Sequence, residues 1–329
     1  MRKALVVGID KYPSQPLQGC ENDAASLANT LTANGDGSPN FSTILMSSSD
    51  TDVTSEALYT ALEKLFSGEA ETVLFYFSGH GILDETTNAG YIVSQDGKKG
   101  GWGVSLSDII SMANRAHPKI KSTVIILDSC NSGYVGEIQG LSASQVNAIG
   151  TGVTILTACH RDGTAEAGRD QSLFTSLLLD ALSGGSADIC GRITPASVYS
   201  HVDQALGAWG QRPIYKANVQ SFITLRNIAP KIPFDVLRRL PQFFKNPTDV
   251  FALDPSYEPD RINIPQEYRD IPVNEENIRT FKELQLCNRH GLVVPVEAEH
   301  MYYAAINSKG CKLTALGAHY RKLAKDGKI

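Results

Sequence analysis

TVLFYF at residues 72–77 runs into SGHG at 78–81, and TVIIL at 123–127 runs into DSCNSG at 128–133. Short runs of β-branched and aromatic residues that end near glycine predict strands buried on both faces of a parallel sheet. The carboxyl ends of such strands meet at one edge of the sheet, where open α/β folds bind their ligands. We therefore expect His80 and Cys130 to be delivered to the same edge.

His80 and Cys130 are the two residue types that nucleophilic catalysis by cysteine requires. A free thiol has a pKa of about 8.5, and a neighbouring imidazole can take its proton and later protonate a leaving amine. The backbone amides of Gly81 and Cys130 are the candidates for an oxyanion hole. The competing interpretation makes His80 a loop histidine and Cys130 a small buried residue. The position of both at strand ends favours the catalytic interpretation.

The sequence up to residue 228 alternates strands with helices. A polar, glycine-rich segment from Asp84 to Gly103 predicts a small hairpin around Tyr91 to Val93. The alternation predicts an α/β fold with a mainly parallel six-stranded sheet flanked by helices. The expected strands are 3–9, 41–46, 72–77, 122–127, 152–157 and 219–225, and the expected helices are 21–33, 53–66, 105–114, 172–182 and 194–206.

The two blocks around His80 and Cys130 resemble the catalytic blocks of the caspase-like cysteine peptidases (clan CD, peptidase C14), above all the bacterial metacaspase type. Asn131 departs from many metacaspases, which have histidine there, but this position is outside the dyad. The resemblance covers roughly residues 1–228 and implies a caspase-like peptidase domain. It is carried further by KALVVGID at 3–10, GCENDA at 19–24, TAC at 157–159, AE at 165–166 and QRP at 211–213.

The resemblance also implies an S1 pocket made of Cys20, Asp23, Ser78 and Asp128. Two carboxylates in a partly dehydrated pocket attract a cation strongly, so cleavage after arginine or lysine is expected. Two simpler interpretations stay open. Asp23 can be an acid that favours the positive end of a helix dipole, and Asp128 can be a turn residue that bonds its own backbone.

The resemblance requires no cofactor and allows calcium. Asp96, Asp108 and Glu137 lie near positions where calcium-binding metacaspases have acids, and three carboxylates could supply part of an oxygen shell. However, the sequence has no compact calcium loop, and scattered acids are more often solvated surface.

Composition indicates a soluble globular protein. The 329 residues are 42% hydrophobic with a formal net charge of −5, and no apolar stretch approaches the length of a membrane span. The six cysteines are scattered without CxxC pairs, which favours reduced thiols and a cytoplasmic location.

Residues 229–329 differ in charge from the part before them. Residues 1–229 carry 15 basic and 22 acidic side chains, whereas residues 230–329 carry 15 and 13. A helical pattern at 278–290, Gly-Leu-Val, a hairpin drawn from 293–296 and 302–306, and Leu-Thr-x-Leu-Gly before a final helix resemble a winged-helix domain. A net charge of only +2 argues against dedicated DNA binding without closing that question.

The expected partners are therefore a protein substrate and a regulatory protein that docks on residues 229–329, with no membrane. In bacteria, caspase-like proteases with attached modules often act in stress or antiviral defence, so the resemblance implies an activity held back until a signal arrives. The alternative from another class is a latent caspase-like scaffold whose C-terminal domain mediates protein or DNA interaction.

Self-processing directly behind Cys130 is not expected. Residues 134–153 contain neither lysine nor arginine, so an enzyme that cuts after basic residues has no cleavage site there. Mass spectrometry of the active protein should find this stretch intact. An obligatory cut between 134 and 153 would contradict the prediction.

Overall fold

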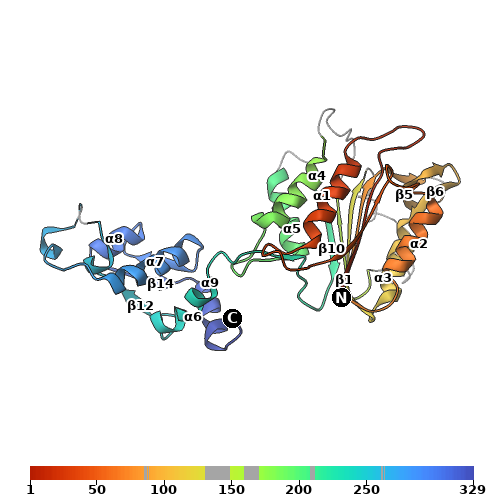
Figure 1. The fold of residues 1–329 in the computed structure, drawn as a ribbon. Helices are drawn as coiled ribbons and strands as arrows, with labels where there is room; N and C mark the ends of the chain where they lie inside the picture. The colour runs from red at the N-terminus through yellow and green to blue at the C-terminus, as the bar shows by residue number, and fades with distance from the viewer. Residues whose placement is uncertain are drawn as a thin grey trace. The chain divides into compact units, whose positions relative to one another are not determined.

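The computed structural model describes residues 1–84, 87, 89–129, 149–158, 170–207, 212–260, 262 and 264–329. The chain divides into two compact units (Figure 1). One unit contains residues 1–187 and 191–229, and the other contains residues 188–190 and 230–329. In the described ranges, no helix has both the length and the apolar character that crossing a bilayer requires.

A six-stranded sheet forms the centre of the first unit. Its order is β10–β8–β7–β3–β1–β2, and every neighbouring pair is parallel except β10 with β8. The two central strands, β3 and β7, are buried along almost their whole length, which explains their continuous apolar sequences. The strands are β1 (Arg2–Gly8), β2 (Ser42–Ser47), β3 (Ala70–Gly79), β7 (Ile120–Ser129), β8 (Val153–Thr157) and β10 (Ile214–Asn218).

Helices cover both faces of this sheet (Figure 1). On one face lie α1 (Cys20–Thr32), α4 (Leu173–Asp180), which continues as a π-helical turn (Ala181–Gly185), and α5 (Pro195–Leu206); on the other lie α2 (Ser55–Leu65) and α3 (Leu106–Ala116). Successive side chains of a strand point to opposite faces, so the sheet separates two cores. Tyr76 lies in the core under α1 and α4, whereas Phe77 lies in the core under α2 and α3.

Side-chain caps begin four of these helices. Hydroxyl groups of Thr54, Ser105, Ser172 and Thr194 accept hydrogen bonds from the first turns of α2, α3, α4 and α5. Each cap satisfies a backbone amide that the helix itself cannot pair. The five predicted helices of this unit are present, with ends shifted by a few residues.

A small antiparallel sheet follows His80. It confirms and extends the predicted hairpin, because three strands rather than two are formed: β4 (Gly81–Asp84), β5 (Ala89–Lys98) and β6 (Gly101–Ser105). It lies against α2 and α3 (Figure 1). A further two-stranded sheet joins β9 (Arg192–Ile193) to β11 (Arg226–Asn227).

The prediction of a strand at 219–225 is wrong. The sixth strand is β10, just before it, which lies at the sheet edge and is only half-buried. An edge strand needs no continuous apolar run, so its sequence gave little signal. The apolar residues that follow serve another purpose: Ile223 and Leu225 cover the end of the α1/α4 core, while Phe222 is 65% exposed beside the Arg192 guanidinium.

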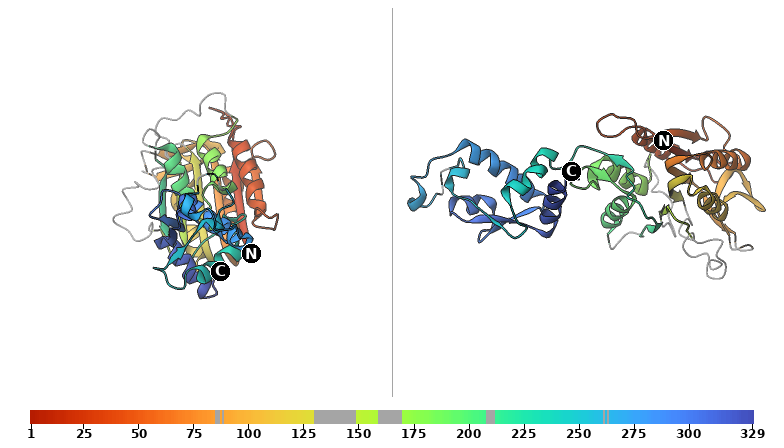
Figure 2. Two further views of the ribbon diagram at one scale, coloured as in Figure 1. Left: turned by 90° about the vertical axis from the view of Figure 1, so that its left-hand side faces the viewer. Right: turned by 90° about the horizontal axis from the view of Figure 1, so that it is seen from below.

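The second unit is a small α+β domain with its own core. Figure 2 shows its helices, in blue and blue-green, around a three-stranded antiparallel sheet of order β12–β14–β13. Its elements are α6 (Phe234–Phe243), β12 (Val250–Ala252), two 3₁₀ turns (Pro255–Tyr257 and Gln266–Tyr268), α7 (Glu275–Arg289), β13 (Val293–Val296), α8 (Met301–Ile306), β14 (Gly310–Leu313) and α9 (Ala315–Lys325).

The C-terminal prediction is confirmed at its two helices and wrong between them. The helix predicted at 278–290 is α7, and the final helix begins after Thr314, whose hydroxyl accepts from Gly317 N. Residues 302–306 are not a hairpin strand but part of α8, and β13 pairs with β14 instead. The winged-helix resemblance stays a prediction.

Candidate active site

The carboxyl ends of β3 and β7 bring the two predicted catalytic blocks together. Ser78 pairs with Asp128, and Gly79 pairs with Ser129. His80 directly follows Gly79. Cys130 directly follows Ser129 and lies outside the described residues. The expectation that both blocks reach one edge of a parallel sheet holds up to Ser129.

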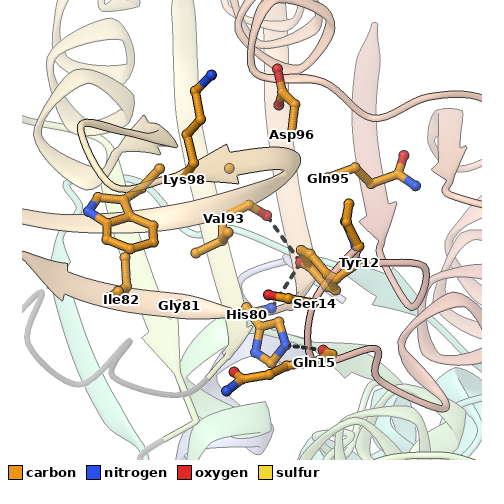
Figure 3. Close-up of a pocket in the computed structure, with 13 residues that line it drawn as sticks. Tyr12, Ser14, Gln15, His80, Gly81, Ile82, Val93, Gln95, Asp96 and Lys98 are labelled. Atoms are coloured by element: carbon orange, nitrogen blue, oxygen red, sulfur yellow. Dashed lines mark hydrogen bonds between the residues drawn. The ribbon is translucent and has the colours of Figure 1, made fainter.

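Tyr12 fixes the backbone and one ring face of His80 (Figure 3). The Tyr12 hydroxyl accepts from His80 N at 3.0 Å and donates to Val93 O at 3.1 Å. The two rings pack with centroids 4.5 Å apart. Burial raises the pKa of the Tyr12 phenol, so it remains a neutral hydroxyl that can make both bonds.

Gln15 fixes the imidazole itself. His80 Nε2 lies 2.7 Å from the backbone carbonyl oxygen of Gln15 (Figure 3). A carbonyl oxygen only accepts, so Nε2 carries the proton and Nδ1 is the nitrogen that can accept one. Gln15 holds this carbonyl in a left-handed backbone conformation, with φ of 56°, which non-glycine residues seldom adopt.

The glycines around His80 have different roles. A Cβ at Gly79 would lie 2.6 Å from Tyr12 Oη, so only glycine lets the tyrosine reach the histidine amide. Gly81 is the first residue of β4 and pairs with Ile92, while Val93 N donates to His80 O at 2.9 Å. His80 is therefore held between the large sheet and the small one.

The four residues expected in the S1 pocket gather on the α1/α4 face. Asp23 Oδ2 accepts from Ser78 Oγ at 3.1 Å, and Asp23 Oδ1 accepts from Ser172 N at 3.0 Å. Asp128 Oδ2 accepts from the hydroxyl of the same Ser172 and from Thr175 Oγ1 at 2.7 Å. One serine, the N-cap of α4, thus bridges two buried carboxylates.

Close packing of α1 on β1 places Asp23 in this cluster. A side chain at Gly8 would collide with the carbonyl oxygen of Cys20 and with Ala24 Cβ. Asp10 then binds the helix from outside, since its carboxylate accepts from Cys20 N at 2.9 Å and from Glu21 N at 3.2 Å. The amides at the positive end of α1 are taken by Asp10, while the Asp23 carboxylate turns to Ser78 and Ser172.

Burial and repulsion shift the protonation of this cluster. Burial, and next the charge of Asp128, raise the pKa of Asp23 from 3.8 to about 7. Burial likewise raises the pKa of the Cys20 thiol well above its ordinary value, so Cys20 stays protonated and is no second nucleophile. Asp23 is 1% exposed and Asp128 is 6% exposed, so the cluster is covered.

The predicted calcium acids that are described lie at two different helix starts. Asp96 Oδ1 accepts from Ser55 N at 2.8 Å and from Ser94 Oγ at 2.6 Å, at the start of α2. Asp108 Oδ2 accepts from Ser105 Oγ at 2.7 Å, at the start of α3. Glu137 lies outside the described residues. In the described part of the chain, no three metal-ligating side chains gather, and calcium binding stays a prediction.

Sequence reasoning missed Tyr12, Gln15, Ser172 and Thr175. Tyr12 and Gln15 could have been found from their place in the loop after the first strand, because this loop lies at the sheet edge where His80 was expected. Ser172 could have been found as a serine that begins a predicted helix. Its second role, bridging two carboxylates, depends on contacts with residues 149 and 44 positions away.

A cavity of about 430 Å³ opens beside His80 (Figure 3). It is lined by residues 12–15, 80–82, 93 and 95–98 and by Trp102. None of the four S1 residues lines it. The histidine therefore lies between a cluster of acids on one face of the sheet and a cavity on the other.

Comparison with known families decides the family of the chain. Residues 1–223 match the model of the caspase domain. The chain belongs to the caspase family. This membership supports a protease-type function and implies protein substrates. No curated protein matches the chain.

The chain is similar to several solved structures. Protein GSU0716 from Geobacter sulfurreducens is 15% identical with a TM-score of 0.51, over 70% of this chain and 98% of that one. The Drosophila initiator caspase Dronc is 15% identical with a TM-score of 0.47, over 66% and 79%. Caspase-1 from Spodoptera frugiperda is 12% identical with a TM-score of 0.47, over 69% and 90%.

Asp23 should make the caspase unit less stable at high pH. Its carboxyl binds a proton more tightly in the folded chain than in the unfolded chain, so its contribution falls as the pH rises from about 4 to about 7. Asp23→Asn keeps the shape and removes the buried charge. We expect thermal unfolding to show that Asp23→Asn raises the free energy of unfolding by about 1–3 kcal/mol at pH 8. At pH 4 the substitution should give no increase.

Asp96→Asn is the matched control, measured with a chelator. Burial by itself would raise the pKa of Asp96. Hydrogen bonds from Ser94 and Ser55 and the charge of Lys98 outweigh burial, so the pKa is lowered. Its charge therefore stabilises the fold above its ordinary pKa, and the substitution should lower stability at pH 8. If Asp23→Asn lowered the stability at pH 8, the prediction that the buried Asp23 charge destabilises the fold would be wrong.

Proposed function

We propose that this caspase-family chain is a cysteine endopeptidase that cleaves proteins after arginine or lysine. The observation that carries the proposal is the meeting of two buried carboxylates, Asp23 and Asp128, beside the strand end that bears His80. A guanidinium or ammonium group entering between them would replace neutral hydroxyl donors with a charged donor, which adds Coulomb attraction to the hydrogen bonds. Their mutual repulsion would be relieved at the same time.

The proposed chemical steps use Nδ1 of His80 as the base. Nδ1 takes the proton of the Cys130 thiol, and the thiolate sulfur attacks the carbonyl carbon of the scissile bond. The backbone amides of Gly81 and Cys130 are the proposed donors to the oxyanion. The imidazolium then gives its proton to the leaving amine, and water hydrolyses the thioester to release the acid and the thiol.

The Gln15 carbonyl supports these steps by holding Nε2–H. An imidazole anchored in this way keeps Nδ1 as its basic nitrogen, and the carbonyl dipole stabilises the imidazolium that forms during the reaction. Tyr12 keeps the ring from tilting away. These two contacts give His80 the orientation that a general base needs.

Burial of the acid cluster supports a regulated enzyme. With Asp23 and Asp128 almost fully covered, Ser172 must move before a basic side chain can reach both carboxylates. We therefore propose that this arrangement is a resting form. Control by a partner bound to residues 229–329, and a role in bacterial stress or antiviral defence, belong to the same proposal.

Peptide hydrolysis tests the proposed activity. Fluorogenic peptides with Arg, Lys or Asp before the scissile bond are assayed with the wild type, Cys130→Ala and Asp23→Asn, with calcium and with a chelator. The Arg and Lys peptides should be cleaved, Cys130→Ala should be inactive, and Asp23→Asn should lose about 10- to 100-fold in kcat/KM because a charged partner is lost.

Each alternative gives a different result in this assay. Preference for the Asp peptide would overturn the basic specificity, and no turnover of any peptide would leave a latent protease that awaits its partner or the scaffold interpretation. A rate that depends on calcium would support a metal site. Equal rates with calcium and chelator would remove calcium from the proposal.

Gln15→Pro should break the hydrogen bond between His80 Nε2 and the Gln15 carbonyl oxygen. Proline fixes φ near −65°, which is incompatible with the left-handed conformation of Gln15. The carbonyl should leave Nε2, and kcat should fall about 10- to 100-fold with a smaller change in KM. Gln15→Gly permits the native φ and should recover most of this loss. Equal kcat values for the two variants would contradict a positioning role for this carbonyl.

A further inference from the structure

The cavity beside His80 and the acid cluster lie on opposite sides of the central sheet. Two residues of the cavity wall, Tyr12 and Val93, belong to the core that contains Phe77. The acid cluster belongs to the other side, because Asp128 is joined through Thr175 to Tyr76, with Thr175 Oγ1 2.6 Å from Tyr76 Oη. Figure 1 shows α1 and α4 on one side and α2, β5 and β6 on the other.

His80 lies where these two regions meet, and its ring forms part of the cavity wall (Figure 3). In the proposed reaction, His80 gives a proton to the leaving amine, so the residue after the scissile bond must lie beside the imidazole. A peptide with its basic side chain between Asp23 and Asp128 therefore continues past His80 toward the cavity. The residues before the scissile bond would then lie on the α1/α4 side of the sheet, and the residues after it would lie on the cavity side.

The small sheet lines the cavity with apolar side chains. Ile82, Val93 and Trp102 contribute apolar side chains to its wall. The indole is held in place by a hydrogen bond from Nε1 to Asp84 Oδ2 at 3.0 Å. Figure 3 shows Asp96 and Lys98 toward the end of the cavity away from His80.

Two polar side chains of the wall are engaged within the protein. The Gln95 side chain accepts from Val53 N at 2.5 Å and donates to Lys11 O at 2.9 Å. Asp96 accepts from Ser55 N and Ser94 Oγ. A side chain that enters beside His80 therefore gains more from apolar contact than from these amide and carboxylate groups.

We propose that this cavity binds the substrate segment that follows the scissile bond and selects a large apolar side chain at its first or second position. The inference rests on the proposed peptidase activity and adds a second specificity site to it. About 430 Å³ is within the usual range for a ligand pocket, roughly 300–1,000 Å³. It has room for a large aliphatic or aromatic side chain.

The test uses the full-length protein and internally quenched peptides that share Arg before the scissile bond. The residue at the first or second position after it is Leu, Phe, Ser, Asp or Lys. The wild type should prefer Leu or Phe over Ser by about 10- to 100-fold in kcat/KM. In Ile82→Ser, which places a hydroxyl in the apolar wall, this ratio should fall to about threefold or less.

Ile44→Ser is the matched control. Ile44 lies on the edge strand β2, is 50% exposed and belongs to neither site. It loses the same side chain and should keep the wild-type ratio. A ratio of two peptides is independent of the fraction of folded enzyme, so partial unfolding of a variant leaves the result interpretable.

Alkylation of Cys130 by a peptidyl-arginine chloromethyl ketone separates this inference from the proposed function. The reagent has no residue after the scissile position, so Ile82→Ser and the wild type should react at similar rates. Failure of the wild type to react would overturn the proposed function and this inference with it. Reaction combined with equal cleavage of all peptides, preference for Asp or Lys, or a Leu preference that survives Ile82→Ser would overturn this inference alone.

Discussion

The parallel pairing of β3 with β7 is the constraint on which the rest of the site depends. Its register sets Ser78 opposite Asp128 and Gly79 opposite Ser129. A shift of one residue would turn every side chain of a strand to the other face. The register is fixed because both strands are buried on both faces, with Tyr76 and Phe77 in different cores. Core packing therefore sets the geometry of the strand ends.

The same sheet divides the chemistry of the site into two regions. Carboxylates collect on the side of α1 and α4, where Ser172 bridges Asp23 and Asp128. Apolar side chains line the cavity on the side of the small sheet, which begins at Gly81. A histidine at this boundary could act on a peptide bond whose preceding and following residues are bound by different regions of the site. The proposed specificity follows from this division and from no single residue.

Buried charge at Asp23 opposes the stability of this fold. The carboxyl has two hydrogen-bond donors, Ser78 and Ser172, but it also faces the charge of Asp128. A fold selected only for stability would have no reason to hold two acids under cover. A unit that buries two large cores can tolerate this cost, and under the proposed function the buried charge would attract a cationic side chain.

The sequence by itself determined five of the six strands of the large sheet, the five helices that flank it and the two blocks that lead to His80 and Cys130. Buried strands and capped helices leave periodic, local signals, and glycine flanks His80 in the sequence. It could not locate the edge strand β10, because a half-buried strand at the sheet edge has no continuous apolar run. It also misplaced the partner of β13, because α8 occupies the connection where a hairpin was expected.

Only the tertiary structure decided how the site is held. The carbonyl of Gln15 on Nε2, the hydroxyl of Tyr12 on the His80 amide and the bridge through Ser172 join residues that are distant in sequence. The cavity on the far side of the sheet is likewise formed by four separate segments. Such contacts depend on packing distances between elements, and a sequence pattern records the elements but not the distances between them.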